Sequence, residues 1–350
     1  MTTPLASLRE RLRAVRRVCS RAGSRAGSRA GSHAGSCAGS RAGSRADSRA
    51  DSRANSRADS HADSHADSHA DSHADSHAYS RTFRRACAVL ALSLLAGCQQ
   101  PPLVDGIAWQ LDNAHLHPRG DWARLGATDL LVQWTVVDGV AYVSGTGLPA
   151  AAQLPDWARI AQEPWARHAL VGLAGRYDEA AARKDLEQLV EQSLRVAAAP
   201  PPVRIDGWYF PVEVDPTWHD AAALAPLLAR LPRPLWISVY DQSNIGGAAL
   251  AEWLDGWLPR DVGVLFQDGV GLYTREPRVA REYADALAAR LGAARVRIIA
   301  EAFRPGTGGQ FRAATAAELK PQLDAYRGYR TYLFDGPHYV PPALVEDLLK

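Results

Sequence analysis

From Asp105 onwards, short apolar runs alternate with longer segments whose apolar positions repeat every three to four residues. The runs have the composition of buried strands, and the segments between them have the spacing of amphipathic helices. The expected strands are Gly106–Leu111, Asp129–Val137, His168–Leu173, Asp206–Glu213, Pro234–Tyr240, Asp261–Gln267, Val296–Ala302 and Thr331–Phe334. The expected helices are Asp178–Ala198, Thr217–Leu231, Gly246–Leu258, Pro277–Leu291 and Thr315–Tyr326.

Strands that alternate with helices form βαβ units and a parallel sheet. Eight such units within about 245 residues fit a closed (β/α)8 barrel, the TIM barrel, better than an open sheet. A dinucleotide-binding doubly wound sheet would carry G-x-G-x-x-G after the first strand, but the sequence there is LDNAHLHPRG. We therefore predict an α/β protein with a (β/α)8 TIM barrel over residues 105–350.

The first 80 residues follow another pattern, a tetrad repeat of the types RAGS, RADS and HADS without Trp or Ile. Ser, Gly and Asp are poor helix formers, and the segment has too little apolar surface to fold. We predict that this low-complexity repeat, residues 1–80, is disordered. Residues 1–97 carry a net charge of +8 and residues 98–350 a net charge of −6. The acidic barrel segment argues against nucleic acid as a partner.

Residues 81–97 have the features of an export signal. Three arginines, the last of them Arg85, precede the apolar run Ala86–Ala96, which is too short to span a bilayer as a helix. The run ends in Leu95-Ala96-Gly97-Cys98, which resembles the lipobox of bacterial lipoproteins. That resemblance implies a signal peptide that is removed and a lipid attached to Cys98.

Residues 98–104 read as a short tether, and Gln99 rather than Asp after the cysteine indicates the outer membrane. The expectation is an exported protein that is anchored to the membrane through Cys98 and faces the periplasm. No cysteine follows Cys98, so the barrel is expected to contain no disulfide.

In a (β/α)8 barrel, catalytic side chains stand at the C-terminal ends of the strands. These ends are rich in carboxylates, amides and aromatic rings, and they lack cysteine, lysine and a G-x-S-x-G elbow. They carry Gln110 and Asp112, Gln133 and Thr135, Arg176 and Tyr177, Glu213 and Asp215, Tyr240 and Asp241, Gln267 and Asp268, Glu301 and Phe303, and Asp335 and His338.

Glu213 and Glu301 are the predicted catalytic pair, because they end the fourth and seventh strands and can face each other across the barrel mouth. Glycoside cleavage needs two such carboxyls, one to protonate the leaving oxygen and one to attack or to activate water. The alternative is that each glutamate pairs with an arginine, such as Arg304 or Arg176, and only holds a loop.

Other side chains near the strand ends are expected to bind a sugar. Aromatic rings suit the apolar face of a sugar, and amides, carboxylates and imidazoles suit its hydroxyl groups. The candidates are Asp268, Gln133, Trp134, Trp109, Tyr209, Gln267, Phe303 and His115. The alternatives are core packing for any single tryptophan and the capping of a turn for the aspartate before glycine.

His115-Leu116-His117 follows the first strand, where amidohydrolase barrels carry two metal-binding histidines. Those barrels also need histidines at the ends of strands five and six, but Tyr240-Asp241 and Gln267-Asp268 stand there. We therefore predict no metal and no organic cofactor.

Several segments together resemble a bacterial domain family of unknown function that is grouped with glycoside-hydrolase TIM barrels. They are Gly106–Gln110, Gln133-Trp134-Thr135, the GWYFPVE segment Gly207–Glu213, the QDGVG segment Gln267–Gly271 and the EAF segment Glu301-Ala302-Phe303. The resemblance covers about residues 106–339. It implies an acid/base on strand four and a nucleophile on strand seven, roles that fall on Glu213 and Glu301. The large retaining clan has Asn before the strand-four glutamate, whereas this chain has Val212.

The favoured hypothesis is a glycoside-hydrolase-like lipoprotein that cleaves a glycosidic bond in an extracytoplasmic polysaccharide or oligosaccharide, with retention if Glu213 and Glu301 are the pair. The rival hypothesis is a non-catalytic glycan-binding lipoprotein that assists polysaccharide export or assembly. It needs the aromatic rings and Gln133, but it does not need two carboxyls at catalytic separation.

Overall fold

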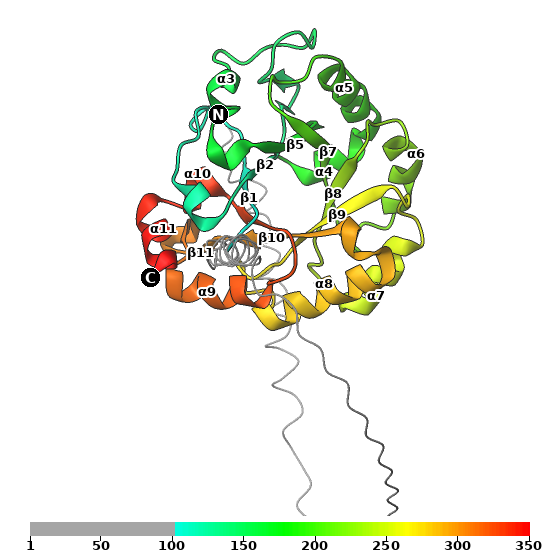
Figure 1. The fold of residues 1–350 in the computed structure, drawn as a ribbon. Helices are drawn as coiled ribbons and strands as arrows, with labels where there is room; N and C mark the ends of the chain where they lie inside the picture. Colours follow the sequence, from blue (N-terminus) through cyan, green and yellow to red (C-terminus); the bar gives the residue numbers. More distant parts are fainter. Residues whose placement is uncertain (1–101) are drawn as a thin grey trace, which may run out of the picture. The chain divides into compact units, whose positions relative to one another are not determined.

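The computed structural model describes residues 102–350, which form a closed barrel of eight parallel strands surrounded by helices (Figure 1). Around the barrel the strands follow the order β1-β13-β10-β9-β8-β7-β5-β2. Their bounds are β1 Gly106–Trp109, β2 Asp129–Val132, β5 His168–Gly172, β7 Ile205–Val214, β8 Leu235–Val239, β9 Val262–Gln267, β10 Val296–Glu301 and β13 Thr331–Phe334. The predicted (β/α)8 barrel is confirmed. The predicted repeat, the signal peptide, Cys98 and the tether up to residue 101 lie outside the described residues.

The helices are α3 Trp157–Ile160, α4 Glu179–Lys184, α5 Leu186–Ala198, α6 Leu224–Leu228, α7 Gly247–Asp255, α8 Pro277–Leu291, α9 Ala316–Ala325, α10 Gly336–Tyr339 and α11 Pro342–Leu349. Short 3-10 helices lie at Trp122–Leu125, Pro164–Ala166, Ala221–Ala223, Ala293–Arg295 and Thr307–Gly309. Figure 1 shows α5 to α9 on the outside of the barrel strands. Within residues 102–350, none of the helices combines the length and the apolar character needed to cross a membrane.

Two predicted elements are divided in the structure. The predicted strand Asp129–Val137 leaves the barrel after Val132, and its last residues form β3 (Val136–Val137), which pairs with β4 (Val140–Ala141) and β6 (Ala174–Gly175) in a separate sheet. The predicted helix Asp178–Ala198 is interrupted at Asp185, which ends α4 and precedes α5. A second small sheet pairs β11 (Phe303–Pro305) with β12 (Phe311–Ala313).

The barrel interior is filled by one side chain from each barrel strand. These residues form one buried cluster: Ala108, Leu131, Leu170, Tyr209, Trp236, Leu265, Ile299 and Tyr332. Glycines make room for the two largest rings, because a Cβ atom at Gly263 would lie 2.3 Å from the Trp236 ring and one at Gly106 would lie 2.6 Å from the Tyr332 ring. The filled interior leaves the C-terminal ends of the strands as the place for a ligand.

Successive side chains of a strand point to opposite sides. The residue two positions after each cluster member therefore points to the same side of its strand as that member does, toward the barrel axis. These positions hold Gln110, Gln133, Ser238, Gln267, Glu301 and Phe334. On β7 the register with β8 shifts between Phe210 and Val214, and Glu213 rather than Pro211 lines the cavity together with Ser238. Bulges of this kind are frequent near active sites, where they re-aim a side chain.

Candidate functional site

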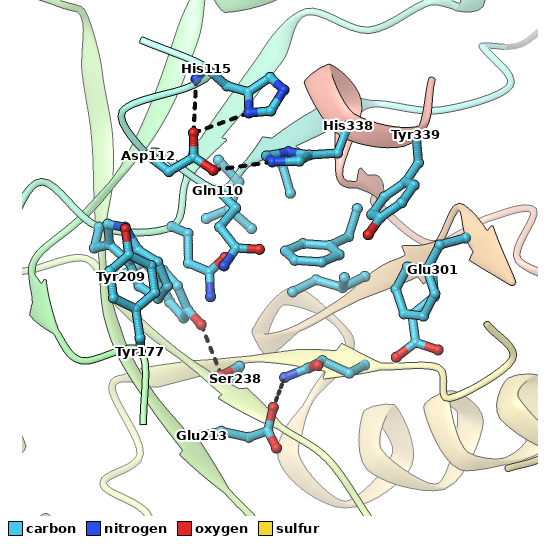
Figure 2. A pocket seen from close by; sticks show the side chains of 18 of the residues that line it. Gln110, Asp112, His115, Tyr177, Tyr209, Glu213, Ser238, Glu301, His338 and Tyr339 are labelled. Carbon is cyan, nitrogen blue, oxygen red and sulfur yellow. Dashed lines mark hydrogen bonds and ion pairs between the residues drawn. The ribbon is translucent and has the colours of Figure 1, made fainter. Parts of the chain in front are cut away.

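A cavity of about 320 Å³ lies at the C-terminal ends of the barrel strands (Figure 2). Both predicted catalytic residues, Glu213 and Glu301, line it. Most of the predicted sugar-binding residues line it as well, namely Gln133, Trp134, Tyr209, Gln267, Phe303 and His115. The structure therefore brings together side chains from β7, β9 and β10 and from the segments that follow β1, β2 and β10.

Glu213 lies near the end of β7 and is 6% exposed. Its carboxylate Oε2 accepts a hydrogen bond of 2.6 Å from the Nε2 amide of Gln267 on β9. Its backbone N–H donates to the Glu179 carboxylate at 3.1 Å, and its carbonyl accepts from the Arg183 guanidinium at 3.0 Å. Helix α4 thus holds the backbone of Glu213, while Gln267 orients its carboxylate.

Glu301 ends β10 and is 1% exposed. Its backbone N–H donates to Oδ1 of Asp268 at 3.2 Å, and its carbonyl accepts from Arg304 at 3.0 Å. Arg304 also donates to the carbonyl of Phe303 and to the Gln322 side chain. Arg176, the other arginine considered as a partner in the sequence, forms an ion pair with Asp185 at 2.8 Å.

The second glycine of the QDGVG segment makes room for Glu301. A Cβ atom at Gly271 would lie 2.6 Å from the Glu301 Cβ and 2.9 Å from its Oε2. The first glycine, Gly269, has a φ of +67°, in the left-handed region that favours glycine. The turn after β9 therefore lies close to a carboxylate of the site.

Two predicted sugar-binding residues are not on the cavity wall. Trp109 is fully buried, packs against Trp157 at a ring distance of 5.6 Å, and donates from Nε1 to the His115 carbonyl. Asp268 is also fully buried and accepts hydrogen bonds from Tyr326 and Gln322. Each of them directly follows a residue whose side chain faces the barrel interior or the cavity. Because successive side chains of a strand alternate, those of Trp109 and Asp268 point out of the barrel toward the surrounding elements.

The aromatic residues of the cavity are held by contacts with one another and by hydrogen bonds. Trp134 packs edge-on against Tyr177 at 5.1 Å and donates from Nε1 to the Leu111 carbonyl. The Tyr209 hydroxyl donates to Ser238 at 2.9 Å. Fixed rings of this kind give the cavity apolar surfaces beside its carboxylates.

One part of the cavity wall carries Asp112, His115 and His338, which form a cluster of imidazoles and carboxylates with the fully buried Asp335. His338 lies between the two carboxylates. Its Nε2 is 3.3 Å from Oδ2 of Asp112, and its Nδ1 is 2.9 Å from Oδ1 of Asp335. Burial lowers the pKa of His338, but the two carboxylates outweigh burial and raise that pKa to about 10. Burial likewise raises the pKa of Asp112, but His338 and His115 outweigh it and lower that pKa to about 2.

Sequence reasoning gave no role to several residues of the cavity wall. Asp112, Tyr177 and His338 stand at predicted strand ends, and this position could have predicted that they line the site. Glu179 and Tyr339 lie beyond the strand ends, in the first turn of α4 and in α10. Their place on the wall depends on how the loops fold back over the barrel.

The fold and the cavity define a (β/α)8 barrel with a carboxylate-lined site at the C-terminal ends of its strands. No protein-family model matches the sequence, and no curated protein matches it. Among solved structures, the chain is similar to a protein from Bacteroides thetaiotaomicron VPI-5482 that carries the provisional name alpha-L-fucosidase. The two are 17% identical with a TM-score of 0.50, and the match covers 72% of this chain and 94% of the other.

A second similar structure is the glycoside hydrolase domain of PgaB (BpsB) from Bordetella bronchiseptica. It is 12% identical with a TM-score of 0.43, and the match covers 69% of this chain and 95% of that domain. At 17% identity, the likeness to the first structure supports the fold.

Proposed function

We propose that this protein hydrolyses a glycosidic bond in an extracytoplasmic polysaccharide or oligosaccharide. Glu213 acts as the acid/base and Glu301 as the nucleophile. The observation that carries the proposal is the presence of both carboxylates on the wall of one cavity, at the ends of β7 and β10. Glycosidases place two carboxyls on either side of the scissile bond.

The surroundings of the two glutamates also support a sugar ligand. Trp134, Tyr177 and Tyr209 present aromatic surface to the cavity, and Gln133 and Gln267 present amides. Val212 is fully buried, so the position that holds Asn in the large retaining clan contributes to the core here. The amide beside Glu213 comes instead from Gln267, which is bonded to its carboxylate. A similar barrel that carries a fucosidase name agrees with this class of substrate.

The proposal predicts that the wild-type protein releases soluble sugars or 4-nitrophenol from at least one member of a panel of bacterial polysaccharides and 4-nitrophenyl glycosides. The double variant Glu213→Gln/Glu301→Gln should bind the same glycan with similar affinity and release no product, because it keeps the cavity shape and loses both carboxylates. Chromatography with mass spectrometry measures product, and calorimetry measures binding. Glu252→Gln, on the exposed side of α7, is the control and should retain activity.

Binding of a glycan by the wild type without product would favour the non-catalytic glycan-binding lipoprotein. Absence of both binding and cleavage across the panel would contradict both the hydrolase and the glycan-binding hypothesis. Cleavage that survives in the double variant would remove Glu213 and Glu301 from the mechanism.

We also propose that the barrel is exported and anchored in the outer membrane through a lipid on Cys98. The expected result is that the protein incorporates a labelled fatty acid and sediments with membranes, and that Cys98→Ser abolishes both, because serine has no thiol to acylate. Cys87→Ser, inside the apolar run of the signal, is the matched control and should keep the label. An unlabelled wild-type protein would contradict the anchor.

A further inference from the structure

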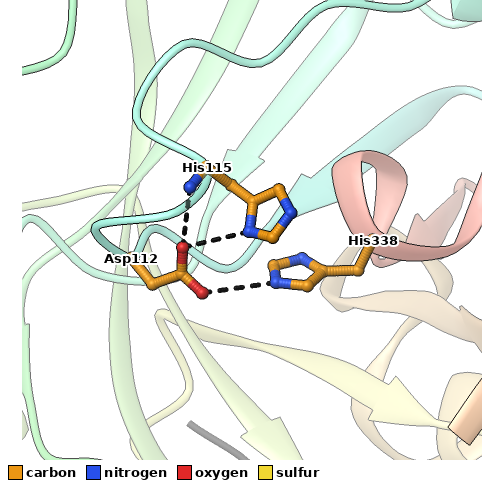
Figure 3. A group of neighbouring side chains, drawn as sticks. All are labelled: Asp112, His115 and His338. Atoms are coloured by element: carbon orange, nitrogen blue, oxygen red, sulfur yellow. Dashed lines mark hydrogen bonds and ion pairs between the residues drawn. The ribbon is translucent and has the colours of Figure 1, made fainter. Parts of the chain in front are cut away.

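Three side chains at one edge of the cavity have the composition of a metal site (Figure 3). Asp112 and His115 follow β1, and His338 lies in α10, directly after β13. One ligand atom from each of these residues lies within 4.8 Å of the other two. β1 and β13 are neighbours in the closed barrel, so the closure of the barrel brings these residues together.

Each imidazole has a nitrogen close to one oxygen of the Asp112 carboxylate, near the spacing of adjacent ligands on one metal ion. His115 Nδ1 lies 3.0 Å from Asp112 Oδ1, and His338 Nε2 lies 3.3 Å from Asp112 Oδ2. With bonds of about 2.0–2.2 Å to zinc, adjacent ligands of a tetrahedral ion lie about 3.3–3.5 Å apart. Two imidazoles and one carboxylate are also a common ligand set of open zinc sites.

The ligands are themselves oriented by further hydrogen bonds. Asp335, which is fully buried, lies 2.9 Å from Nδ1 of His338 and accepts from the backbone N–H of Gln110 at 2.7 Å. A carboxylate on one imidazole nitrogen fixes the ring so that the other nitrogen faces the metal. Asp112 Oδ1 accepts from the backbone N–H groups of Ala114 and His115, both at 2.8 Å.

The cluster also opens on the cavity, because Asp112, His115 and His338 all line it. Figure 2 shows these three side chains on a different part of the wall from Glu213 and Glu301. We propose that Asp112, His115 and His338 bind one divalent transition-metal ion, with zinc the best match to the ligands, and that its open coordination position faces the cavity. The pair His115-Leu116-His117 does not form this site, because the exposed His117 accepts instead from the Asp156 backbone at 3.3 Å.

The alternative is a hydrogen-bonded cluster without an ion, in which His338 stays protonated between Asp112 and Asp335. The two cases differ in what happens when zinc is added to metal-free protein. A site built from three ligands loses its tight ion when one ligand is removed, whereas a hydrogen-bonded cluster has no tight ion to lose.

The full-length protein is freed of metal with EDTA and titrated with Zn²⁺ by calorimetry, and with Co²⁺ by visible absorption, which reports the coordination geometry. We expect one tight ion per chain. Binding should be at least about 100-fold weaker in His115→Gln and in His338→Gln, because losing a ligand costs more than the roughly 10- to 100-fold loss typical of an outer-shell partner. His117→Gln, two residues from His115, is the matched control and should bind as the wild type does. The histidines of the N-terminal repeat are present in every variant, so any ions that they bind cancel in the comparison.

Absence of a tight ion in the wild type, or equal affinity in the wild type and both variants, would overturn the proposal. His115 is partly exposed on a loop, so His115→Gln is expected to keep its fold, which circular dichroism checks. Glu301→Gln should bind zinc normally, because Glu301 is not a ligand of the proposed ion. Failure of the metal site and failure of the proposed hydrolysis are therefore distinguishable.

Discussion

Azide is expected to restore turnover to Glu301→Ala. In this variant the attacking carboxylate is gone, so hydrolysis of an aryl glycoside should fall by about 10⁴-fold or more. The space left by the carboxylate admits a small anion, which attacks the same face of the sugar in a single displacement. The product should be a glycosyl azide of inverted configuration, which nuclear magnetic resonance identifies.

Glu213→Ala should respond differently to azide. Loss of the acid should lower hydrolysis of a natural glycan by about 10²- to 10⁴-fold, and much less for an aryl glycoside whose leaving group needs no proton. The covalent intermediate on Glu301 still forms, so azide attacks that intermediate and yields a glycosyl azide of retained configuration. Identical products from both variants, or no rescue in either, would contradict the assigned roles and the retaining mechanism.

The positions of the barrel strands were predictable because each buried run is bounded by polar or helical segments. The strand Thr331–Phe334 has the predicted bounds, and β9 and β10 differ from the prediction by one residue at one end. Since the carboxyl ends of parallel strands meet at one end of a barrel, the meeting of Glu213 and Glu301 on one cavity was also predictable. The separate sheet that contains Val136–Val137 was not, because its strands are too short to leave a pattern.

The misplacement of Trp109 and Asp268 has a single physical reason. Strands of a (β/α)8 barrel are buried on both sides, so hydrophobicity does not tell which residues face the interior. Once Ala108 and Leu265 are known to fill the barrel, alternation puts Gln110 and Gln267 on the cavity side. Trp109 and Asp268 then face outward.

The cluster around His338 depends on contacts between the two ends of the described chain. His338 and Asp112 are 226 residues apart in sequence. Each was visible at a strand end, but their contact follows from the closure of the barrel between β1 and β13. No local pattern encodes which loops meet across that closure.

The outward-facing Asp268 accepts hydrogen bonds from four donors. Oδ1 accepts from the backbone N–H groups of Val270 at 3.1 Å and of Glu301 at 3.2 Å. Oδ2 accepts from the Tyr326 hydroxyl at 2.8 Å and from the Gln322 amide. The carboxylate therefore ties the end of β10 to the turn after β9 and to the helical segment behind it, which makes Asp268 a positioning residue for Glu301.

Asp268→Ala is expected to lower the free energy of unfolding by about 4 kcal/mol, because it leaves several buried donors without an acceptor. Asp268→Asn is the matched variant, since it can keep the acceptor for both backbone N–H groups and should cost about 1–2 kcal/mol. Urea unfolding measures both through the transition midpoint at constant slope. Equal midpoints for Ala and wild type would contradict the role of Asp268.

The pH dependence of the same comparison follows from the burial of Asp268. Burial raises the pKa of Asp268 in the folded protein. The Asp268 carboxyl therefore keeps its proton to a higher pH in the folded state than in the unfolded chain. Wild-type stability should therefore fall as the pH rises from about 4 through the raised pKa, whereas Asp268→Asn has no such proton to lose. The stability cost of Asp268→Asn should shrink over that range.

The two variants should also differ in activity. Because asparagine retains the bond to the Glu301 backbone, the activity of Asp268→Asn should stay close to that of the wild type. Asp268→Ala should lose activity even where it remains folded.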